Sequence, residues 1–144
     1  MTTEQVLAHR PGRLGQRLGV LSVVAFARVL ARRPPAQICW VLRQASRGAR
    51  PATFAEAAAA RRHTVANSAF CAGPLGCLPR SITTALLCRM RGGWPTWVAG
   101  VRRHPPFGAH AWVEAQGTAV DEPYPPDFHI PLLTVPPTER GSAG

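Results

Sequence analysis

Residues 77–93 read CLPRSITTALLCRMRGG, and the character of the chain changes at the two glycines that close this stretch. Before the glycines, apolar residues at helical spacing predict a helix from about residue 77 to residue 90. After them come three strand-like segments, WPTWVAGVRR, FGAHAWVEA and TAVDEP, separated by the short loops HPP and QG. A helix followed by closely connected strands indicates a small antiparallel sheet.

Three more helices are expected upstream of this stretch. Apolar residues at steps of three and four predict a first amphipathic helix ending before Pro34, with its stripe at Leu14, Leu18, Leu21 and Ala25 and with Val24 and Leu30 adjoining. Residues 36–46 have the same apolar spacing and predict a second helix. Residues 53–68 predict a third helix, because Thr53 and Glu56 have the spacing of a capping box.

The expected fold class is therefore α+β, with amino-terminal helices packed on a small antiparallel sheet. A chain of 144 residues fits one domain, 1–144. We divide it into a helical amino-terminal part (1–70), a core that carries the chemistry (71–130) and a proline-rich tail (131–144) that is expected to be partly disordered. The segment HIPLLTV, residues 129–135, is a candidate last strand.

The chain is strongly basic, with a net charge of +10 that comes entirely from arginine. Sixteen of the 17 arginines precede His104, so this part could face an anionic partner, or arginine could simply solvate helix surfaces. No basic run is interleaved with aromatic residues as in single-strand binders, and nucleic acid is not expected as a partner. The longest apolar run, residues 18–27, is about half a membrane span, which predicts a cytoplasmic protein without a membrane segment.

Four cysteines form no CxxC pair and have no histidine at zinc-ligand spacing, so neither a metal nor a cofactor is expected. Cys77 stands at the predicted helix start, where free N–H groups and the helix dipole stabilise a thiolate. The same amides could line an oxyanion hole. Cys71, in the loop before the helix, is the rival nucleophile, whereas Cys39 and Cys88 have the surroundings of packed helix residues. Cys77 could also be only a small buried hydrophobe.

His110 is the candidate general base. If Gln116 and Gly117 form a two-residue hairpin turn, Trp112 faces Asp121 across the hairpin and His110 shares their face, diagonal to Asp121. This register predicts a Cys77–His110–Asp121 triad, the chain order of papain-like and transglutaminase-like cores. A slip of one residue would exchange Asp121 for Glu122, and a histidine in a sheet is often only structural.

The same residues carry a resemblance to a known family. CLPRSITTALLCRMRGG, followed by VAGVRRHPPFGAHAWVEAQGTAVDEP, resembles the transglutaminase-like cysteine peptidase of lasso peptide biosynthesis, the standalone leader peptidase or B-protein. The matching positions are Cys77, Arg80, Ser81, Gly100, Val101, Pro106, Phe107, His110, Trp112 and Glu114, and the match extends to about residue 122. Family members often end the hairpin in Asn-Asp or Asp-Asp rather than Asp-Glu.

The resemblance implies that the protein removes the leader from a ribosomally made precursor peptide, so that an ATP-dependent lasso cyclase can close the freed core. It further implies a separate winged-helix leader-recognition protein as partner, with the cyclase as another candidate. Two other functions stay open. The triad would also serve a transglutaminase-like acyltransferase, and the arginine-rich helices would also suit a nonenzymatic basic adaptor for anionic peptide or nucleic acid.

Overall fold

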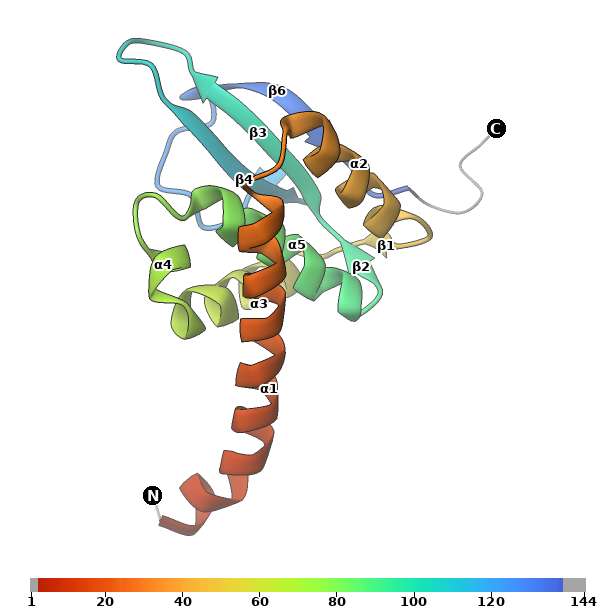
Figure 1. Cartoon of the computed structure of the whole chain (residues 1–144), viewed down its shortest axis with the longest axis vertical. Coiled ribbons are helices and arrows are strands. Elements are labelled where there is room, and N and C mark those ends of the chain that lie inside the picture. The colour runs from red at the N-terminus through yellow and green to blue at the C-terminus, as the bar shows by residue number, and fades with distance from the viewer. Residues whose placement is uncertain (1–2, 139–144) are drawn as a thin grey trace.

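The helices precede the sheet along the chain, as the sequence predicts (Figure 1). The structure is a computed structural model that describes residues 3–138, with side chains from residue 14 onward. Within these residues the helices are α1 (Thr3–Leu30), α2 (Pro35–Ser46), α3 (Phe54–Asn67), α4 (Ala69–Ala72) and α5 (Cys77–Met90). The strands are β1 (Arg50–Pro51), β2 (Gly93–Trp94), β3 (Thr96–Arg102), β4 (Ala109–Ala115), β5 (Thr118–Ala119) and β6 (His129–Val135). The predicted α+β class is confirmed.

The main sheet is antiparallel and has the strand order β5-β4-β3-β6. Gln116 and Gly117 form the turn between β4 and β5, and both have positive φ, 53° and 78°. Ala115 pairs with Thr118 directly across this turn, which is the predicted hairpin register. On the other side of β4, Gly100 of β3 pairs with His110. Thus β4 has neighbours on both sides, although β5 is short.

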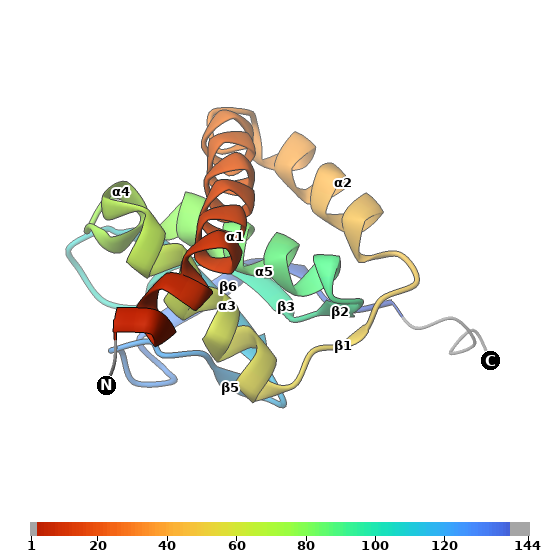
Figure 2. The ribbon, with the colours of Figure 1, turned by 90° about the horizontal axis from the view of Figure 1, so that it is seen from below.

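The core lies between the sheet and the helices. Helix α5 packs against β3 and β4 on one side and against α1 and α3 on the other, and Figure 2 shows α5 between α1 and β3. One face of β4 enters this core through Ala111, Val113 and Ala115. The alternate face carries His110, Trp112 and Glu114. The pleat of β4 therefore separates packing residues from residues available for chemistry.

Helix α3 begins as its sequence predicts. The Thr53 hydroxyl accepts a hydrogen bond from the Glu56 backbone, and the Glu56 side chain accepts one from the Thr53 N–H, which completes the capping box. Glu56 also pairs with Arg50 at 2.8 Å. Because of these contacts, with the Arg50 hydrogen bond as the largest contribution, the pKa of Glu56 falls to about 2.

The predicted apolar surface of the first helix is only partly right: the adjoining Val24 and Leu30 face the core, but the stripe that starts at Leu14 does not. Leu14 and Leu18 are 61% and 57% exposed, whereas Val20, Val24, Ala27 and Leu30 are the buried residues of α1. The helix turns the second set toward α5 because valine, alanine and leucine at these steps form a continuous stripe of their own. No helix among the described residues is both long and apolar enough to cross a membrane.

The first part of the predicted proline-rich tail is a strand. Strand β6 runs through residues 131–135 and pairs with β3, and its Val135 is fully buried in the core. Trp94 reinforces this connection by donating its indole N–H to the Val135 carbonyl at 3.0 Å. The predicted strand at 129–135 is confirmed, and residues 139–144 lie outside the described part of the chain.

Candidate active site

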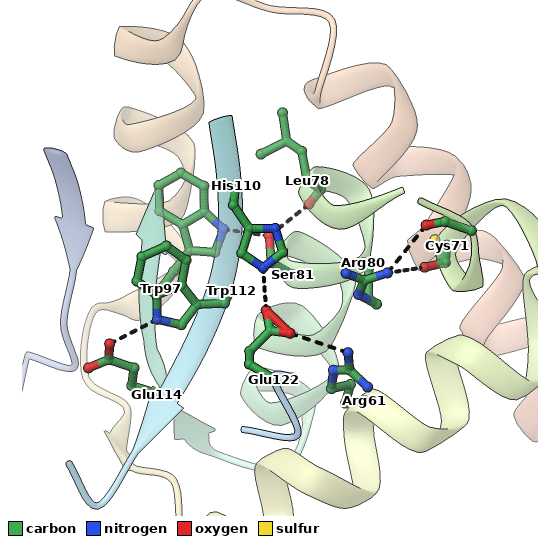
Figure 3. A network of polar contacts seen from close by, with 11 residues as sticks. Arg61, Cys71, Leu78, Arg80, Ser81, Trp97, His110, Trp112, Glu114 and Glu122 are labelled. Atoms are coloured by element: carbon green, nitrogen blue, oxygen red, sulfur yellow. Dashed lines mark hydrogen bonds and ion pairs between the residues drawn. The ribbon is translucent and has the colours of Figure 1, made fainter. Parts of the chain in front are cut away.

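Cys77 is the first residue of α5, as the sequence predicts. The helix N-cap is Gly76, and a Cβ at this position would lie 2.1 Å from the Phe70 carbonyl oxygen, so only glycine fits. Arg80 stabilises the preceding loop by donating to the carbonyl of Cys71 at 2.8 Å (Figure 3). The loop and the helix start are thereby fixed relative to each other, and they define the position of the Cys77 sulfur.

The first turn of α5 presents two free backbone donors. The amides of Cys77 and Leu78 have no partner within the helix, because the first intrahelical bond runs from Arg80 N–H to the Gly76 carbonyl. Pro79 lacks an N–H, so its place in this turn leaves no further donor to satisfy. The geometry predicted for an oxyanion site is therefore present next to the sulfur.

The open edge of β4 brings the sheet to Cys77. Strand β5 pairs only with Glu114 and Ala115, and the last bond of this ladder runs from Val120 N–H to the Val113 carbonyl. Two residues earlier on β4, the Ala111 N–H points to the same side with no strand beside it. There it lies close enough to the Cys77 sulfur to lower the pKa of the thiol, and the His110 side chain acts on the thiol in the same way.

The acid that contacts His110 is Glu122, not Asp121. Glu122 Oε1 lies 2.6 Å from His110 Nε2, whereas Asp121 is exposed and makes no hydrogen bond to the ring. The predicted register is correct as far as Val120, but Asp121 has a φ of 51° and leaves the extended conformation. This left-handed residue breaks the alternation of side chains, so the next residue reaches the face that carries His110. The Asp121 assignment was therefore wrong.

Arg61 of α3 holds the second oxygen of Glu122. The Arg61 Nη2 to Glu122 Oε2 distance is 3.4 Å, and the Glu122 side chain is only 6% exposed. Figure 3 shows Glu122 between the imidazole and the guanidinium. The carboxylate is thus fixed from two sides. Sequence reasoning missed Arg61, because nothing in the helix sequence distinguishes it from the neighbouring surface arginines.

The electrostatics of the pair favour a thiolate and a charged ring. Burial raises the pKa of Cys77, but the hydrogen bonds from His110 and Ala111, together with the charges of His110 and Arg80, outweigh it and lower the pKa below its usual value. Burial likewise opposes the charge on His110, yet the hydrogen bonds to Cys77 and Glu122 raise its pKa to about 9. Because Glu122 occupies Nε2, the thiol faces Nδ1 of the ring.

Aromatic rings enclose the rest of His110. His129 of β6 is buried and stacks on it, with ring centroids 4.8 Å apart, and Tyr124 contacts it edge-on at 5.3 Å. Burial and the nearby charge of His110 lower the pKa of His129, which keeps this second imidazole neutral. His129 reaches this position because β6 returns to pair with β3.

The remaining cysteines are packing residues. Cys71, the rival nucleophile, is completely buried in a cluster with Val20 and Val24. Cys39 and Cys88 are buried in the main core, and burial raises the pKa of Cys88 to about 12. Across residues 3–138, no three histidine, cysteine or acidic side chains gather where they could hold a metal ion.

The geometry agrees with a comparison to known families. A family model described as the transglutaminase-like superfamily matches residues 20–130, which is more than half of the chain. The chain belongs to the transglutaminase-like superfamily. All three site residues, Cys77, His110 and Glu122, lie inside the matched range, and the superfamily fits cysteine peptidase or acyltransferase chemistry. No curated protein and no solved structure matches the chain.

The arrangement can perform nucleophilic acyl transfer. A thiolate at a helix start meets an imidazolium that can give its proton to a leaving amine, and a buried carboxylate holds the ring by its other nitrogen. Two free amides lie beside the sulfur for the oxygen of a tetrahedral intermediate. These features together suit the cleavage of an amide through a thioester.

Proposed function

We propose that the protein is a cysteine peptidase that removes the leader from a ribosomally synthesised lasso precursor peptide. The observation that carries the proposal is the contact of the Cys77 thiol with His110, whose other ring nitrogen pairs with Glu122 at 2.6 Å. The sequence CLPRS with HAWVE, which resembles the lasso leader peptidases, supports the choice of substrate.

In the proposed mechanism, the Cys77 thiolate attacks the carbonyl carbon at the end of the leader. The carbonyl oxygen becomes an oxyanion that the free amides of Cys77 and Leu78 stabilise. His110 gives its Nδ1 proton to the leaving amine, which is the new amino terminus of the core peptide. The now neutral ring then takes a proton from water, and the hydroxide attacks the thioester to release the leader acid and restore the Cys77 thiolate beside the charged ring.

Glu122 and Arg61 act on the base and not on the substrate. Glu122 accepts a hydrogen bond from the Nε2–H of His110. This bond fixes the tautomer of the ring and directs Nδ1 to the sulfur. Arg61 keeps the carboxylate in place through its other oxygen. Burial of Glu122 makes this contact effective, since the charged pair is removed from water that would screen it.

The proposal includes partners. A separate winged-helix leader-recognition protein would present the precursor, and the ATP-dependent cyclase would receive the freed core. The basic surface is compatible with an acidic peptide partner, because 16 arginines precede His104 and only seven acids are present in the whole chain.

The test is to incubate the protein with the precursor and recognition protein encoded beside its gene and to weigh the products. The proposal expects separate leader and core masses with wild type, and no cleavage with Cys77→Ala or His110→Ala. Asp121→Asn serves as the matched control, because it removes a neighbouring charge at an exposed residue that tolerates the left-handed conformation.

Three outcomes would overturn the proposal. Cleavage that persists in both Cys77→Ala and His110→Ala would exclude the triad. A product heavier by an added amine, without leader release, would establish acyl transfer. Salt-sensitive binding of the peptide without any turnover, equal in wild type and Cys77→Ala, would establish a nonenzymatic adaptor.

A further inference from the structure

A cavity of about 370 Å³ opens beside His110 on the face of β4 that is turned away from the core. Its walls are formed by His110, Trp112, Glu114, Glu122, Tyr124 and His129, and by Gly117, β5 and the Pro125–Pro126 segment. Its size suits a single side chain or a small ligand. A larger cavity of about 420 Å³ lies between α1, α3 and α5, but none of the triad residues lines it.

The cavity contains one carboxylate that the triad does not use. Trp112 donates its indole N–H to Glu114 Oε2 at 2.8 Å, which fixes the carboxylate at the end of the cavity away from His110 (Figure 3). Among the side chains that the structure describes, no arginine or histidine pairs with Glu114. This is unusual in a chain of 17 arginines and seven acids, and none of the arginines whose side chains are described lines the cavity.

The charges near His110 leave Glu114 as the uncompensated one. Glu122, the other acid in the cavity, is paired with both His110 and Arg61. Arg80 and Arg102 are charged neighbours of Cys77 and His129, but neither lines the cavity. His129 is neutral because burial and the charge of His110 lower its pKa. The remaining negative charge in the cavity is therefore that of Glu114, and it favours a cation there.

The walls suit the same kind of ligand. The rings of Trp112 and His129 lie 5.5 Å apart between centroids, and Tyr124, which is 43% exposed, contacts His129 edge-on at 5.0 Å. An aromatic face attracts a guanidinium or ammonium group, and it also packs on the aliphatic stem of arginine or lysine. A carboxylate at one end and aromatic faces along the sides form a site for such a side chain.

We propose that this cavity is a subsite for a cationic side chain, arginine or lysine, of the peptide that Cys77 cleaves, with Glu114 as its anchoring carboxylate. The identity of the ligand as part of a peptide rests on the proposed function. Along β4, Glu114 lies four residues from His110, or about 14 Å. The cationic residue therefore binds a few positions away from the scissile bond, at one fixed distance from it.

The first experiment digests a synthetic peptide library with wild type, Glu114→Gln and Asp121→Asn, and reads the cleaved sites by mass spectrometry. Gln keeps an oxygen for the Trp112 N–H but removes the charge. Among the sites cleaved by wild type and by Asp121→Asn, arginine or lysine is expected to be enriched at one position relative to the cut. In Glu114→Gln this enrichment is expected to be about tenfold smaller. No basic preference in wild type, or an unchanged preference in Glu114→Gln, would overturn the subsite.

The second experiment separates failure of the subsite from failure of the proposed function, because it needs no cleavage. Cys77→Ala is titrated with N-acetyl-arginine amide and, as the neutral match, N-acetyl-citrulline amide, while the indole N–H signal of Trp112 is followed by NMR. The subsite predicts that the arginine ligand saturates Cys77→Ala at about tenfold lower concentration than the citrulline ligand. In the double variant Cys77→Ala, Glu114→Gln the two ligands are expected to saturate at the same concentration. Equal titrations in Cys77→Ala would refute the subsite whether or not any peptide is cleaved.

Discussion

The contact between Glu122 and His110 makes a quantitative prediction for Glu122→Gln. The glutamine has nearly the same shape and keeps an oxygen at the 2.6 Å contact, but it carries no charge. The charged ring then loses a buried ionic partner, since the Glu122 side chain is only 6% exposed. The substitution is therefore expected to lower the pKa of His110 with little change in packing.

The magnitude follows from the raised pKa of the ring. Burial opposes the charge, and the hydrogen bonds and charges of Cys77 and Glu122 overcome it to give about 9 against an ordinary 6.5. At 1.36 kcal/mol for each pKa unit, this gap is a preference of about 3 kcal/mol for the charged ring. If Glu122 supplies about half of it, the pKa of His110 in Glu122→Gln falls by about one unit or more.

The assay is an NMR titration of the His110 Cε1–H signal between pH 5 and pH 10. A raised pKa means that the ring is charged below it and loses its proton as the pH rises through it. In wild type the transition is expected near pH 9, and in Glu122→Gln at a lower pH. The range in which an imidazolium faces the thiolate therefore narrows from the alkaline side.

The neighbouring acid provides the control. Asp121→Asn removes an equal charge one residue away and is expected to leave the His110 transition in place. If Asp121→Asn lowered the transition and Glu122→Gln did not, the identification of Glu122 as the partner of the ring would be refuted, and the original assignment of Asp121 would be restored.

Three further predictions concern stability. Gly76→Ala places a methyl group 2.1 Å from the Phe70 carbonyl oxygen and is expected to cost about 2 kcal/mol or more in urea unfolding, whereas a cost below about 0.5 kcal/mol would show that this backbone can move apart. Thr53→Ala removes the N-cap of α3 and is expected to lower the free energy of unfolding by about 1 kcal/mol, with Thr53→Ser as the variant that should restore it. Arg50 lowers the pKa of Glu56 to about 2, so the stability that the Glu56 carboxylate contributes is present above about pH 4.5 and is lost as the pH falls through about 2. Wild type and Glu56→Gln should therefore differ in melting temperature at pH 6 and converge near pH 2. A difference that stays constant with pH would contradict the pairing.

The helices of the catalytic half could be predicted because their signals are local. Thr53 and Glu56 satisfy each other's backbone and side-chain groups within one turn, and the start of α5 follows from a glycine and a proline placed around Cys77. The hairpin register was equally accessible, since the positive φ of Gln116 and Gly117 fixes which residues of β4 and β5 face each other.

The third member of the triad could not be predicted by the same reasoning. Side-chain alternation holds only while the backbone is extended, and it fails at Asp121, where φ is positive. Aspartate is one of the few residues that adopt this conformation readily, so the residue type was a warning that the strand ends there. Glu122 then reaches His110 by a turn of the chain that no pairing pattern describes.

Other misses have a tertiary cause. Both possible stripes of α1 are apolar, and only the packing of α5 selects Val20 and Val24 over Leu14 and Leu18. Trp40 of α2 is 62% exposed, although tryptophan is buried in most proteins. Such choices depend on contacts between segments far apart in the sequence, and these cannot be obtained from local periodicity.

The measurement that tests the site most directly is the pH dependence of Cys77 alkylation by iodoacetamide, in wild type and in His110→Ala. Only the thiolate reacts, and the other described cysteines are buried. The site predicts that wild type is alkylated at Cys77 at a lower pH than an ordinary thiol, and that the variant, which keeps the burial but loses the imidazole, reacts only at higher pH. Identical profiles for the two proteins, or alkylation at Cys71 instead, would contradict a thiolate–imidazolium pair at the start of α5.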